Sequence, residues 1–587
     1  MRKPALFALV LGTLAVPGAA SAWQDPLFPG DVPFEDVDAA GAPTFGMSSE
    51  EALLDDVYVD LKDDSSDADI AEVAGVAGVA LSKLSVESDV DKIEVAHVDR
   101  WRIPVIIDLL SRDPHVEHVE QAARVQAYFV PNDPLYNKQW HLKKVGAESA
   151  WSQSCGMGVT VAVVDTGVAC YDKSPFMKGS DLQGTRCVDG YNLVDDSPNA
   201  ADDQGHGTHV AGTIAQTTNN GKGVAGLAYC ASLMPVKVLN KFGWGTTANV
   251  AQGIRWAADH GAQVINLSLG GPIKSQILED AVKHARSKGA IVVAAAGNSG
   301  KSVGYPAAYP EVVAVSATDS NDKIAWFSSR GPEVDIGAPG VSVTQQTICE
   351  NGRNKCELFG TFNGTSMASP HVAGAAAMLV SLGVTDPDAI EAALEASAEP
   401  KDDKNLYGAG RLDAAAASNR VLYTHLGLRV AALFALFALV GAAIKKSGSR
   451  MTKGRGAAIV AALFAGTGLL PFAGTLGLTT MAGPLRPLVE LLMRPFGEWD
   501  VLLSAGLHKF LPLANAGPAL GALLLLYGVK RARPLVGGLA LGSAALLAQM
   551  ALSGDVAFFL GGLGLRVFAV VNALVCFWIA RTALDEK

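Results

Sequence analysis

The sequence predicts an α/β fold: a doubly wound, mostly parallel sheet over residues 135–420, with a small α+β unit before it and an all-α transmembrane bundle after it. Three observations support this prediction. Apolar, β-branched runs alternate with helical patterns over 135–420, shorter strand-like and helix-like segments fill 49–130, and long apolar runs dominate 426–582. Continuous apolar strands alternating with helices are typical of parallel sheets buried on both faces.

Length and charge set limits on the class of protein. The chain has 587 residues, 49% of them hydrophobic, which is too long for one ordinary domain. Its net charge is −11 and its pI is about 5.5. We therefore expect no nucleic-acid partner, because binding to nucleic acid depends on basic surfaces.

The N-terminus is typical of a secretory signal peptide, which we place at residues 1–22. Two basic residues open the stretch, the apolar run ALFALVLGTLAV follows, and the small residues ASA resemble a cleavage site. A short membrane anchor is the alternative. Residues 23–48 are acidic, rich in Pro and Gly and without periodicity, so we interpret them as a linker.

The cysteines also suit an exported chain, because disulfides persist outside the cytosol. Six of the seven lie before residue 420, and Cys576 lies in an apolar run. Six cysteines allow fifteen pairings. Cys349 and Cys356, which bracket the polar segment CENGRNKC, are the favoured pair, and Cys170 and Cys187 are candidates for a second loop.

Residues 49–130 have the pattern of a small α+β domain. DVYVDLK, KIEVAHV and VEHVEQ are strand-like. DADIAEVAGVAGVAL and WRIPVIIDLLSRD are helix-like, although Pro104 weakens the second helix. The next segment, YFVPNDPLYNKQW, contains two prolines and is expected to be an extended connector.

Beyond residue 420 we predict five membrane spans, each near the roughly 20 residues needed to cross about 30 Å of hydrocarbon. A buried hairpin is the alternative for any one of them. The basic segments 445–455 and 530–533 belong in the cytoplasm by the positive-inside rule, which leaves 135–420 on the periplasmic or extracellular side. The predicted spans are 426–444, 456–480, 513–529, 534–552 and 556–580.

Four motifs within 135–420 have the residue types of serine hydrolysis. A serine hydroxyl needs a histidine to accept its proton and a buried carboxylate to hold that imidazole, and the tetrahedral intermediate needs hydrogen-bond donors. Asp165 and Asn298 each end a strand, where sites in parallel sheets lie. The motifs are VAVVDTG with Asp165, DDQGHGTHVAG with His206, AAAGNSG with Asn298 and GTSMASPHVAG with Ser366.

Each motif alone has a simpler explanation. A strand-ending Asp is often a turn former, HGTH could be a metal pair or a capped helix, and a serine before a helix is a common N-cap. Together and in this order, the motifs resemble those of the subtilases, the subtilisin-like serine endopeptidases. The resemblance covers roughly residues 135–418 and implies a subtilisin-like fold.

The resemblance implies a role for each residue. Asp165 matches the triad acid, His206 the general base, Ser366 the nucleophile and Asn298 the oxyanion-hole amide. We expect Pro370 to lie in a first helical turn, where its missing N–H removes no helical hydrogen bond. We expect the next residue, His371, to be a packed structural residue. Ser268, Leu269 and Gly270 resemble the strand that pairs with extended substrate, Gly243 the opposing strand and Gly304 the base of the specificity pocket.

The resemblance implies no cofactor for catalysis, but a structural calcium ion. Asp181 in GSDLQG and Asn220 in TTNNGKGV match calcium-binding positions of the family. The acidic loop NLVDDSPNAADDQG is a second source of the oxygen ligands that calcium prefers, and a solvated loop is its alternative reading.

By size and position, residues 49–130 resemble a subtilase propeptide, which would assist folding and cover the substrate cleft until it is cleaved. A permanent interaction domain is the alternative.

Two functions follow from different classes. The first is a membrane-anchored serine endopeptidase that acts on proteins or peptides outside the cytoplasm, with its own propeptide and the lipid bilayer as partners. The second is a membrane sensor or transport-associated protein whose subtilisin-like domain only binds. The sequence favours the first, because all four catalytic positions are present and the spans contain few ionisable residues.

Overall fold

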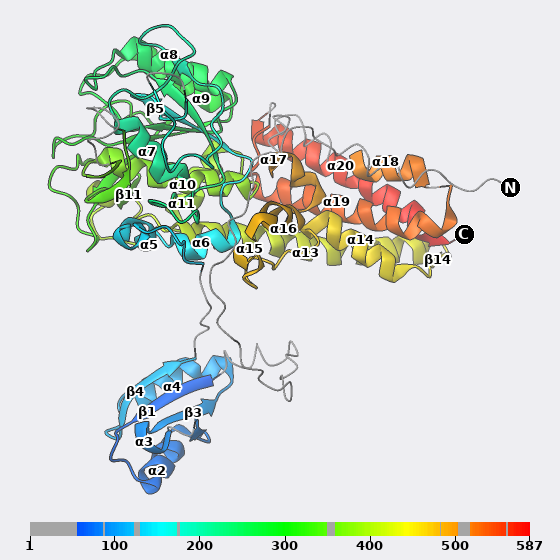
Figure 1. The fold of residues 1–587 in the computed structure, drawn as a ribbon. Coiled ribbons are helices and arrows are strands. Elements are labelled where there is room, and N and C mark those ends of the chain that lie inside the picture. The colour runs from blue at the N-terminus through cyan, green and yellow to red at the C-terminus, as the bar shows by residue number, and fades with distance from the viewer. Residues whose placement is uncertain are drawn as a thin grey trace, which may run out of the picture. The chain divides into compact units, whose positions relative to one another are not determined.

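The computed structural model contains two compact units, residues 1–126 and 127–587 (Figure 1). The predicted signal peptide, the linker and the favoured Cys349–Cys356 pair lie outside the residues that the structure describes. Those residues are 56–586, with gaps at 86–87, 123–128, 173–175, 349–357, 482, 503–516, 527 and 559–560.

The first unit is a four-stranded antiparallel sheet with helices, as predicted for 49–130. The strand order is β2-β3-β1-β4, and a capping box between Ser66 and Asp69 begins α2 (Asp67–Ala77). Pro104 lies in the first turn of α4 (Ile103–Leu110), so it starts this helix and does not weaken it. The other elements are β1 (Asp56–Leu61), β2 (Ser82–Lys83), α3 (Ser88–Asp91), β3 (Ile93–His97), η2 (Arg100–Arg102) and β4 (Val116–Gln121).

The second unit contains the predicted doubly wound sheet. Its order is β11-β10-β9-β8-β5-β7-β6, and each pairing between these strands is parallel. In β5, Val161 and Val163 belong to one core and Ala162 and Val164 to another, the alternation of a strand covered on both faces. The strands are β5 (Thr160–Asp165), β6 (Tyr191–Asn192), β7 (Ser232–Lys237), β8 (Val264–Leu267), β9 (Ile291–Ala295), β10 (Val313–Thr318) and β11 (Ile336–Pro339).

Helices cover both faces of this sheet (Figure 1). α7 (His206–Ala215) and α10 (Thr365–Ser381) share a core with Val161, whereas α8 (Thr247–Asp259) and α9 (Gln276–Ser287) share the other core. The remaining elements of this part are η3 (Tyr136–Lys138), α5 (Trp140–Lys144), α6 (Ala147–Gln153), β12 (Val343–Gln346), β13 (Phe359–Phe362), α11 (Pro387–Glu395) and α12 (Lys404–Tyr407).

Two disulfides occur among the described residues. Cys170–Cys187 confirms the predicted second loop. Cys155–Cys230 joins the segment after α6 to the segment before β7, and only the three-dimensional fold brings these two cysteines together. Cys576 is a buried free thiol.

The C-terminal part of the second unit is a bundle of apolar helices. Among the described residues, three helices are long and apolar enough to cross a membrane: Ala414–Lys446, Lys530–Ser553 and Gly561–Leu584. The first of them, α13, also belongs to the sheet domain, because Ala414, Ala417 and Val421 pack in its core. Residues 420 and 426, where we predicted the sheet region to end and the first span to begin, therefore lie in one continuous helix.

The structure corrects the predicted span 456–480. α14 (Arg455–Thr467) has 13 residues and ends at Gly468, whose φ is 92°. Thirteen residues rise only about 20 Å, too little to cross a bilayer as one helix. The apolar composition continues through this turn, so composition alone could not locate it. The predicted span 513–529 contains α18 (Gly517–Leu526), and the residues before that helix are not described.

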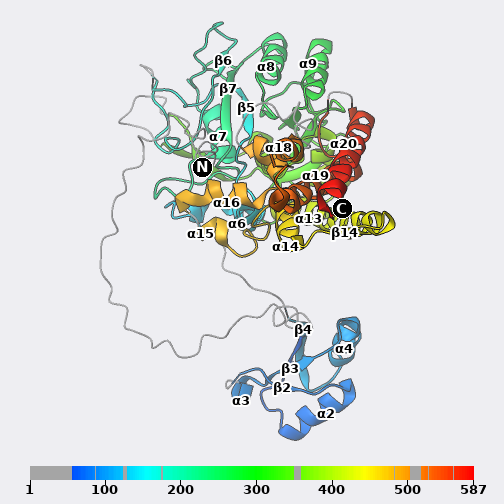
Figure 2. The same cartoon turned by 90° about the vertical axis from the view of Figure 1, so that its right-hand side faces the viewer.

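Short elements complete the helical region. β14 pairs with β15 at the end of the bundle away from the sheet domain (Figures 1 and 2). The elements are β14 (Arg450–Met451), α15 (Leu478–Met481), η4 (Gly483–Leu485), α16 (Arg486–Met493), η5 (Phe496–Glu498), α17 (Trp499–Leu502), η7 (Lys530–Ala532), α19 (Arg533–Ser553), α20 (Gly561–Leu584) and β15 (Asp585–Glu586).

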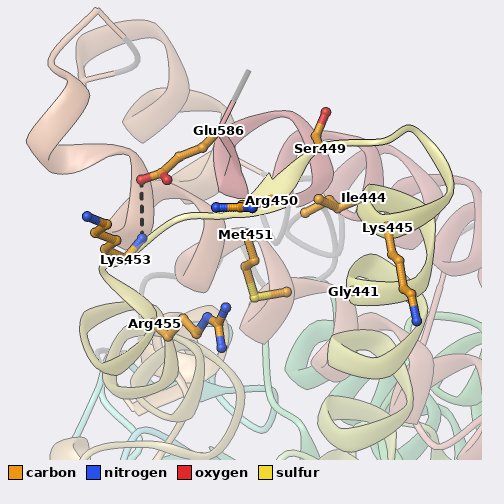
Figure 3. Close-up of a pocket in the computed structure, with 9 residues that line it drawn as sticks. All are labelled: Gly441, Ile444, Lys445, Ser449, Arg450, Met451, Lys453, Arg455 and Glu586. Carbon is orange, nitrogen blue, oxygen red and sulfur yellow. Dashed lines mark hydrogen bonds between the residues drawn. The ribbon is translucent and has the colours of Figure 1, made fainter.

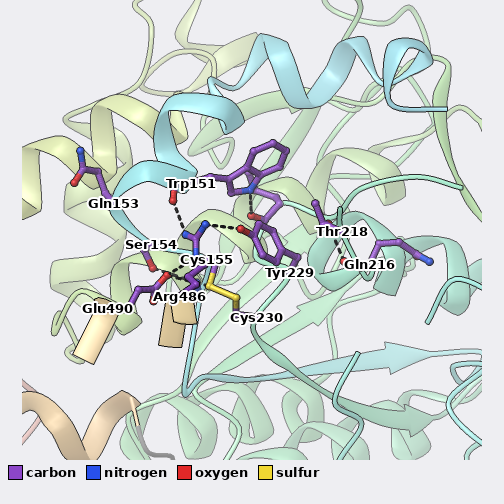
Figure 4. Close-up of a disulfide and its surroundings, with 12 residues drawn as sticks. Trp151, Gln153, Ser154, Cys155, Gln216, Thr218, Tyr229, Cys230, Arg486 and Glu490 are labelled. Carbon is purple, nitrogen blue, oxygen red and sulfur yellow. Dashed lines mark hydrogen bonds and ion pairs between the residues drawn. A yellow bond between two sulfur atoms is a disulfide. The ribbon is translucent and has the colours of Figure 1, made fainter. Parts of the chain in front are cut away.

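A buried arginine joins the helical region to the sheet domain. Arg486 donates hydrogen bonds to Glu490, to the hydroxyl of Tyr229 and to the backbone oxygen of Trp151, beside the Cys155–Cys230 disulfide (Figure 4). A buried guanidinium is costly unless its donors are satisfied. These contacts therefore favour one fixed docking of the two parts.

Buried histidines make the stability of the sheet domain depend on pH. His371 lies fully buried in α10, and its Nε2 is 2.8 Å from Nδ1 of His141. Burial lowers the pKa of His371 to about 4. The pKa of an unfolded histidine is about 6.5, so the unfolded chain binds more protons between about pH 6.5 and 4. The free energy of unfolding should fall by up to about 3 kcal/mol as the pH drops through this window.

Thermal melts of the Ser366→Ala protein, which avoids self-cleavage, should show this loss at acidic pH. The further variant His371→Gln should melt with a weaker dependence on pH, whatever its stability near neutrality. An equal pH dependence in both proteins would show that His371 does not titrate on unfolding.

Candidate active site

The predicted acid and base lie in direct contact. Asp165 is the last residue of β5 and is fully buried, and His206 is the first residue of α7. Nδ1 of His206 lies 2.8 Å from Oδ1 of Asp165. Gly205 precedes the helix with φ of 107°, and a Cβ there would meet Oγ1 of Thr347 at 2.5 Å, so the turn that presents His206 requires glycine.

The electrostatics of this pair favour a histidine that accepts protons. Burial by itself would lower the pKa of His206, but the charge and hydrogen bond of Asp165 outweigh burial and hold this pKa above its ordinary value. The contact also places the Nδ1 proton toward Asp165, which leaves Nε2 as the free acceptor in the neutral ring.

Asp202 holds the loop that presents His206. Its carboxylate accepts hydrogen bonds from the backbone N–H of Gly205, from the N–H and hydroxyl of Thr208, and from the hydroxyl of Thr166, which follows Asp165. Asp202 is buried. Sequence analysis grouped it with candidate calcium ligands of an acidic loop, and only the fold reveals that its oxygens are used by the protein.

The predicted nucleophile lies at the start of α10. Ser366 is the one residue of this helix that is not fully buried. Its hydroxyl donates to the backbone oxygen of Ser268 at 3.1 Å, and the hydroxyl of Ser268 donates to the backbone oxygen of Ser366 at 2.8 Å. No hydrogen bond joins Ser366 to His206 among the described residues. Such contacts are often long in a free enzyme and tighten when substrate binds.

Pro370 explains the second of these bonds. We expected it in a first helical turn, but it lies inside α10, four residues after Ser366. Its missing N–H therefore leaves the backbone oxygen of Ser366 without the usual helical donor. The hydroxyl of Ser268 supplies the replacement, which ties the nucleophile turn to the segment after β8.

Asn298 is oriented by the residue before the nucleophile. Its Oδ1 accepts the backbone N–H of Thr365 at 2.9 Å and the Thr365 hydroxyl at 3.0 Å. Its Nδ2 has no hydrogen-bond partner among the described residues and is therefore available as a donor. The backbone N–H of Ser366 lies in the first turn of α10, where helical N–H groups have no partner within the helix. Thr365 has no motif signal beyond its place beside Ser366.

A cleft of about 540 Å³ adjoins His206. The predicted residues Ser268, Leu269, Gly270 and Gly243 line it. Gly304 does not line it; its neighbours Tyr305 and Pro306 do, and a Cβ on Gly304 would lie 3.1 Å from the backbone oxygen of Gly271. Sequence analysis did not identify Gln204, Trp244, Pro272, Tyr305 and Pro306, which also line the cleft.

The predicted calcium residues, Asp181 and Asn220, lie together with a second acid, Asp133. Asn220 donates from Nδ2 to Oδ1 of Asp181 at 2.7 Å, and Asp133 accepts the backbone N–H groups of Asn219 and Asn220. Burial raises the pKa of Asp133 and raises that of Asp181 to about 6. Neither carboxylate has a basic partner within 4 Å among the described residues. Two buried carboxylates without a cation suit a hard metal ion, although Asn220 would have to present its oxygen to be a ligand.

The acidic loop 192–205 does not form a comparable site. Asp195 accepts from Asn192, Asp196 from the hydroxyl of Tyr191, and Asp203 pairs with Lys237 at 2.7 Å. These three carboxylates have protein partners, whereas the buried Oδ1 of Asn199 accepts no hydrogen bond among the described residues.

Comparisons with known proteins agree with this geometry. Residues 156–410 match the Subtilase family, Peptidase_S8. Thermitase of Thermoactinomyces vulgaris is 42% identical over 291 residues, which cover 49% of this chain and 98% of thermitase. The chain belongs to the subtilase family. Its sheet domain is accordingly a subtilisin-like serine endopeptidase domain of the predicted α/β class.

Further proteases are similar to about half of the chain. Subtilisin Savinase of Lederbergia lenta is 43% identical over 48% of this chain and 98% of its own length. The alkaline protease of Shouchella clausii is 40% identical over 57% of this chain and 84% of its own length. A solved structure described as proteases from Pseudoalteromonas arctica PAMC 21717 has 34% identity and a TM-score of 0.46, over 50% of this chain and 99% of that one.

The pKa of His206 predicts the pH profile of hydrolysis. Only the neutral imidazole can accept a proton, so kcat/KM for a chromogenic peptide should rise with pH through an apparent pKa above the ordinary 6.5. Asp165→Asn should lower kcat by about 10⁴ and move this pKa downward.

Asp259→Asn is a matched control, because Asp259 pairs with Lys288 on an exposed surface. It should leave the profile unchanged. If Asp165→Asn kept the apparent pKa of kcat/KM that the wild type has, the assignment of His206 as the titrating base would be wrong.

Proposed function

We propose that this protein is a membrane-anchored serine endopeptidase whose active site faces the extracytoplasmic side and hydrolyses protein or peptide substrates through Asp165, His206 and Ser366. The observation that most supports the proposal is the 2.8 Å contact between His206 and Asp165, beside a cleft whose Ser268 is hydrogen-bonded to Ser366. A domain that only binds would not need a buried carboxylate against this imidazole.

The reaction follows from these contacts. Ser366 turns its hydroxyl from Ser268 toward Nε2 of His206, which takes the proton as Oγ attacks the scissile carbonyl carbon. Asp165 holds the Nδ1 proton and stabilises the imidazolium that forms. Nδ2 of Asn298 and the backbone N–H of Ser366 donate to the oxyanion. His206 then protonates the leaving amine, and a water activated by the same imidazole cleaves the acyl-enzyme.

The cleft suits an extended peptide. Gly271 and Tyr305 form a two-bond antiparallel bridge, with N···O distances of 2.9 and 2.8 Å, next to the predicted edge 268–270. An extended substrate would add as a strand to this edge, opposite the loop of Gly243. Main-chain hydrogen bonds supply affinity in this mode, and side-chain pockets supply specificity.

The arrangement of the helical bundle supports the membrane assignment. The basic segments 445–455 and 530–533 lie at the end of the bundle away from the sheet domain (Figures 1 and 2). The positive-inside rule places that end in the cytoplasm and the sheet domain outside it, as the predicted signal peptide also requires. The bundle would then anchor the enzyme in the cytoplasmic membrane, with residues 135–420 as the peptidase domain and 426–582 as the membrane region.

We further assign residues 49–130 as a propeptide. The described residues from 56 to 122 belong to a compact unit of their own, and such a unit can fold first and then occupy the cleft until it is removed. The enzyme needs no cofactor for catalysis. Asp133 and Asp181 would hold a structural calcium ion, together with Asn220 once its side-chain amide is turned to present its oxygen.

A membrane-impermeant fluorophosphonate tests the function and the side together. Intact cells that make the protein should be labelled at Ser366, and Ser366→Ala should abolish labelling. Asn298→Ala should slow labelling about 10²- to 10³-fold. Ser369→Ala is a matched control, because Ser369 is a buried serine of the same helix that donates to Asn266. Labelling of inside-out vesicles but not of intact cells would contradict the orientation. No labelling of either preparation would contradict the catalytic assignment.

Chelation tests the calcium assignment. Removal of calcium should lower the melting temperature by roughly 5 °C or more, because an ion bound only by the folded state stabilises it. Asp181→Asn should melt at the lower temperature with or without chelator, whereas Asp195→Asn in the acidic loop should respond as the wild type does. A wild-type melting curve unchanged by chelator would exclude a stabilising ion here.

A further inference from the structure

A second hollow lies at the basic end of the helical bundle, far along the chain from the peptidase site. It has a volume of about 470 Å³ and lies between the C-terminal end of α13, β14, the start of α14 and β15 (Figure 3). Its lining includes Ile444, Lys445, Arg450, Lys453, Arg455 and Glu586.

Positive charge dominates the lining. Lys445, Arg450, Lys453 and Arg455 contribute four cations, and Glu586 contributes the one carboxylate. No ion pair joins any of the four cations to a carboxylate within the described part of the chain. The carboxylate of Glu586 already accepts the backbone N–H of Lys453 at 3.2 Å. Cations gathered around one hollow repel one another, so an anion bound among them would be stabilised.

The hollow also adjoins apolar surface. Ile444 and Gly441 form part of its wall. Farther along the same helices, Leu439 on α13 and Val460 on α14 are 57% and 60% exposed. Exposed apolar side chains on the two helices that form a basic hollow match a ligand that has an anionic head and hydrocarbon tails. A free inorganic anion would use only the basic part.

We propose that this hollow binds the phosphate group of an anionic membrane phospholipid. Figure 3 shows the side chains of Arg450 and Arg455 on either side of Met451. Guanidinium groups bind phosphate oxygens in a two-pronged geometry, and lysines add point charges. Basic pockets between membrane helices on the cytoplasmic side are suited to such head groups. The inference rests on the membrane placement proposed above, which puts this end of the bundle at the cytoplasmic leaflet.

The bound lipid would also stabilise the turn between α13 and α14. β14 lies in this turn, and its backbone pairs with that of β15, with Arg450 opposite Glu586. A phosphate held by Arg450 and Arg455 would therefore fix the strand with which the C-terminal segment pairs.

The test uses the full-length protein in nanodiscs of phosphatidylcholine, with or without phosphatidylglycerol. Native mass spectrometry should detect a phosphatidylglycerol molecule retained in preference to phosphatidylcholine. Arg450→Gln combined with Arg455→Gln should reduce this retention by at least about tenfold, since the two substitutions remove both guanidinium groups that would bind the phosphate. Labelling of Ser366 by fluorophosphonate should persist in the double variant and show that it is folded.

Lys530→Gln combined with Arg531→Gln is the matched control. It removes the same charge from exposed positions at the same end of the bundle that do not line the hollow. Equal loss of lipid in both double variants would overturn the site in favour of diffuse surface attraction, as would equal retention of the two lipids by the wild type. Inorganic phosphate added to phosphatidylcholine discs is the second arm. Stabilisation by phosphate, without retention of phosphatidylglycerol, would contradict a lipid ligand.

The outcome separates this site from the proposed function. If the protein enters the discs and is labelled at Ser366 but retains neither lipid selectively, only the lipid-binding role of the hollow is overturned. A wild-type chain that does not enter discs of either composition would overturn both the membrane placement and this site.

Discussion

Burial of α10 is the constraint on which the active site depends. Every residue of this helix is buried except Ser366 at its start. Its small apolar side chains pack against the sheet on the same face as α7, so the helix has little freedom to slide or turn. The serine is therefore held at one point, beside Asn298 and the edge of the cleft. Positioning of this kind converts an ordinary hydroxyl into a usable nucleophile.

The far end of the same helix meets the membrane region. Beyond α10, the backbone N–H groups of Thr385 and Asp386 both donate to the backbone oxygen of Asp555, which lies between α19 and α20. Arg429 of α13 pairs nearby with Glu498 and Gln549. These buried polar side chains bind one another inside the helical region and do not line a path through it, which suits anchoring better than transport.

The two ends of the bundle differ in chemistry. Toward the peptidase domain, buried Arg486 donates hydrogen bonds to three protein partners. At the opposite end, cations such as Arg450 and Arg455 are exposed and lack carboxylate partners within the described residues. Paired charges can be buried in a rigid contact, whereas unpaired cations must face water or anionic head groups. This asymmetry agrees with the orientation proposed above.

The sequence by itself determined the parallel sheet, the burial of its strands on both faces and the four catalytic candidates, because these depend on the local apolar pattern and on side-chain chemistry. Only the tertiary structure decided which polar groups interact with one another. The oxygens of Asp202 accept hydrogen bonds from the loop that presents His206, and Asp133 lies close to Asp181. The hydroxyl of Ser268 replaces the N–H donor that Pro370 lacks. It also ended the second predicted span at Gly468. Contacts between residues far apart in the chain leave no periodic signal, since they depend on how whole elements pack.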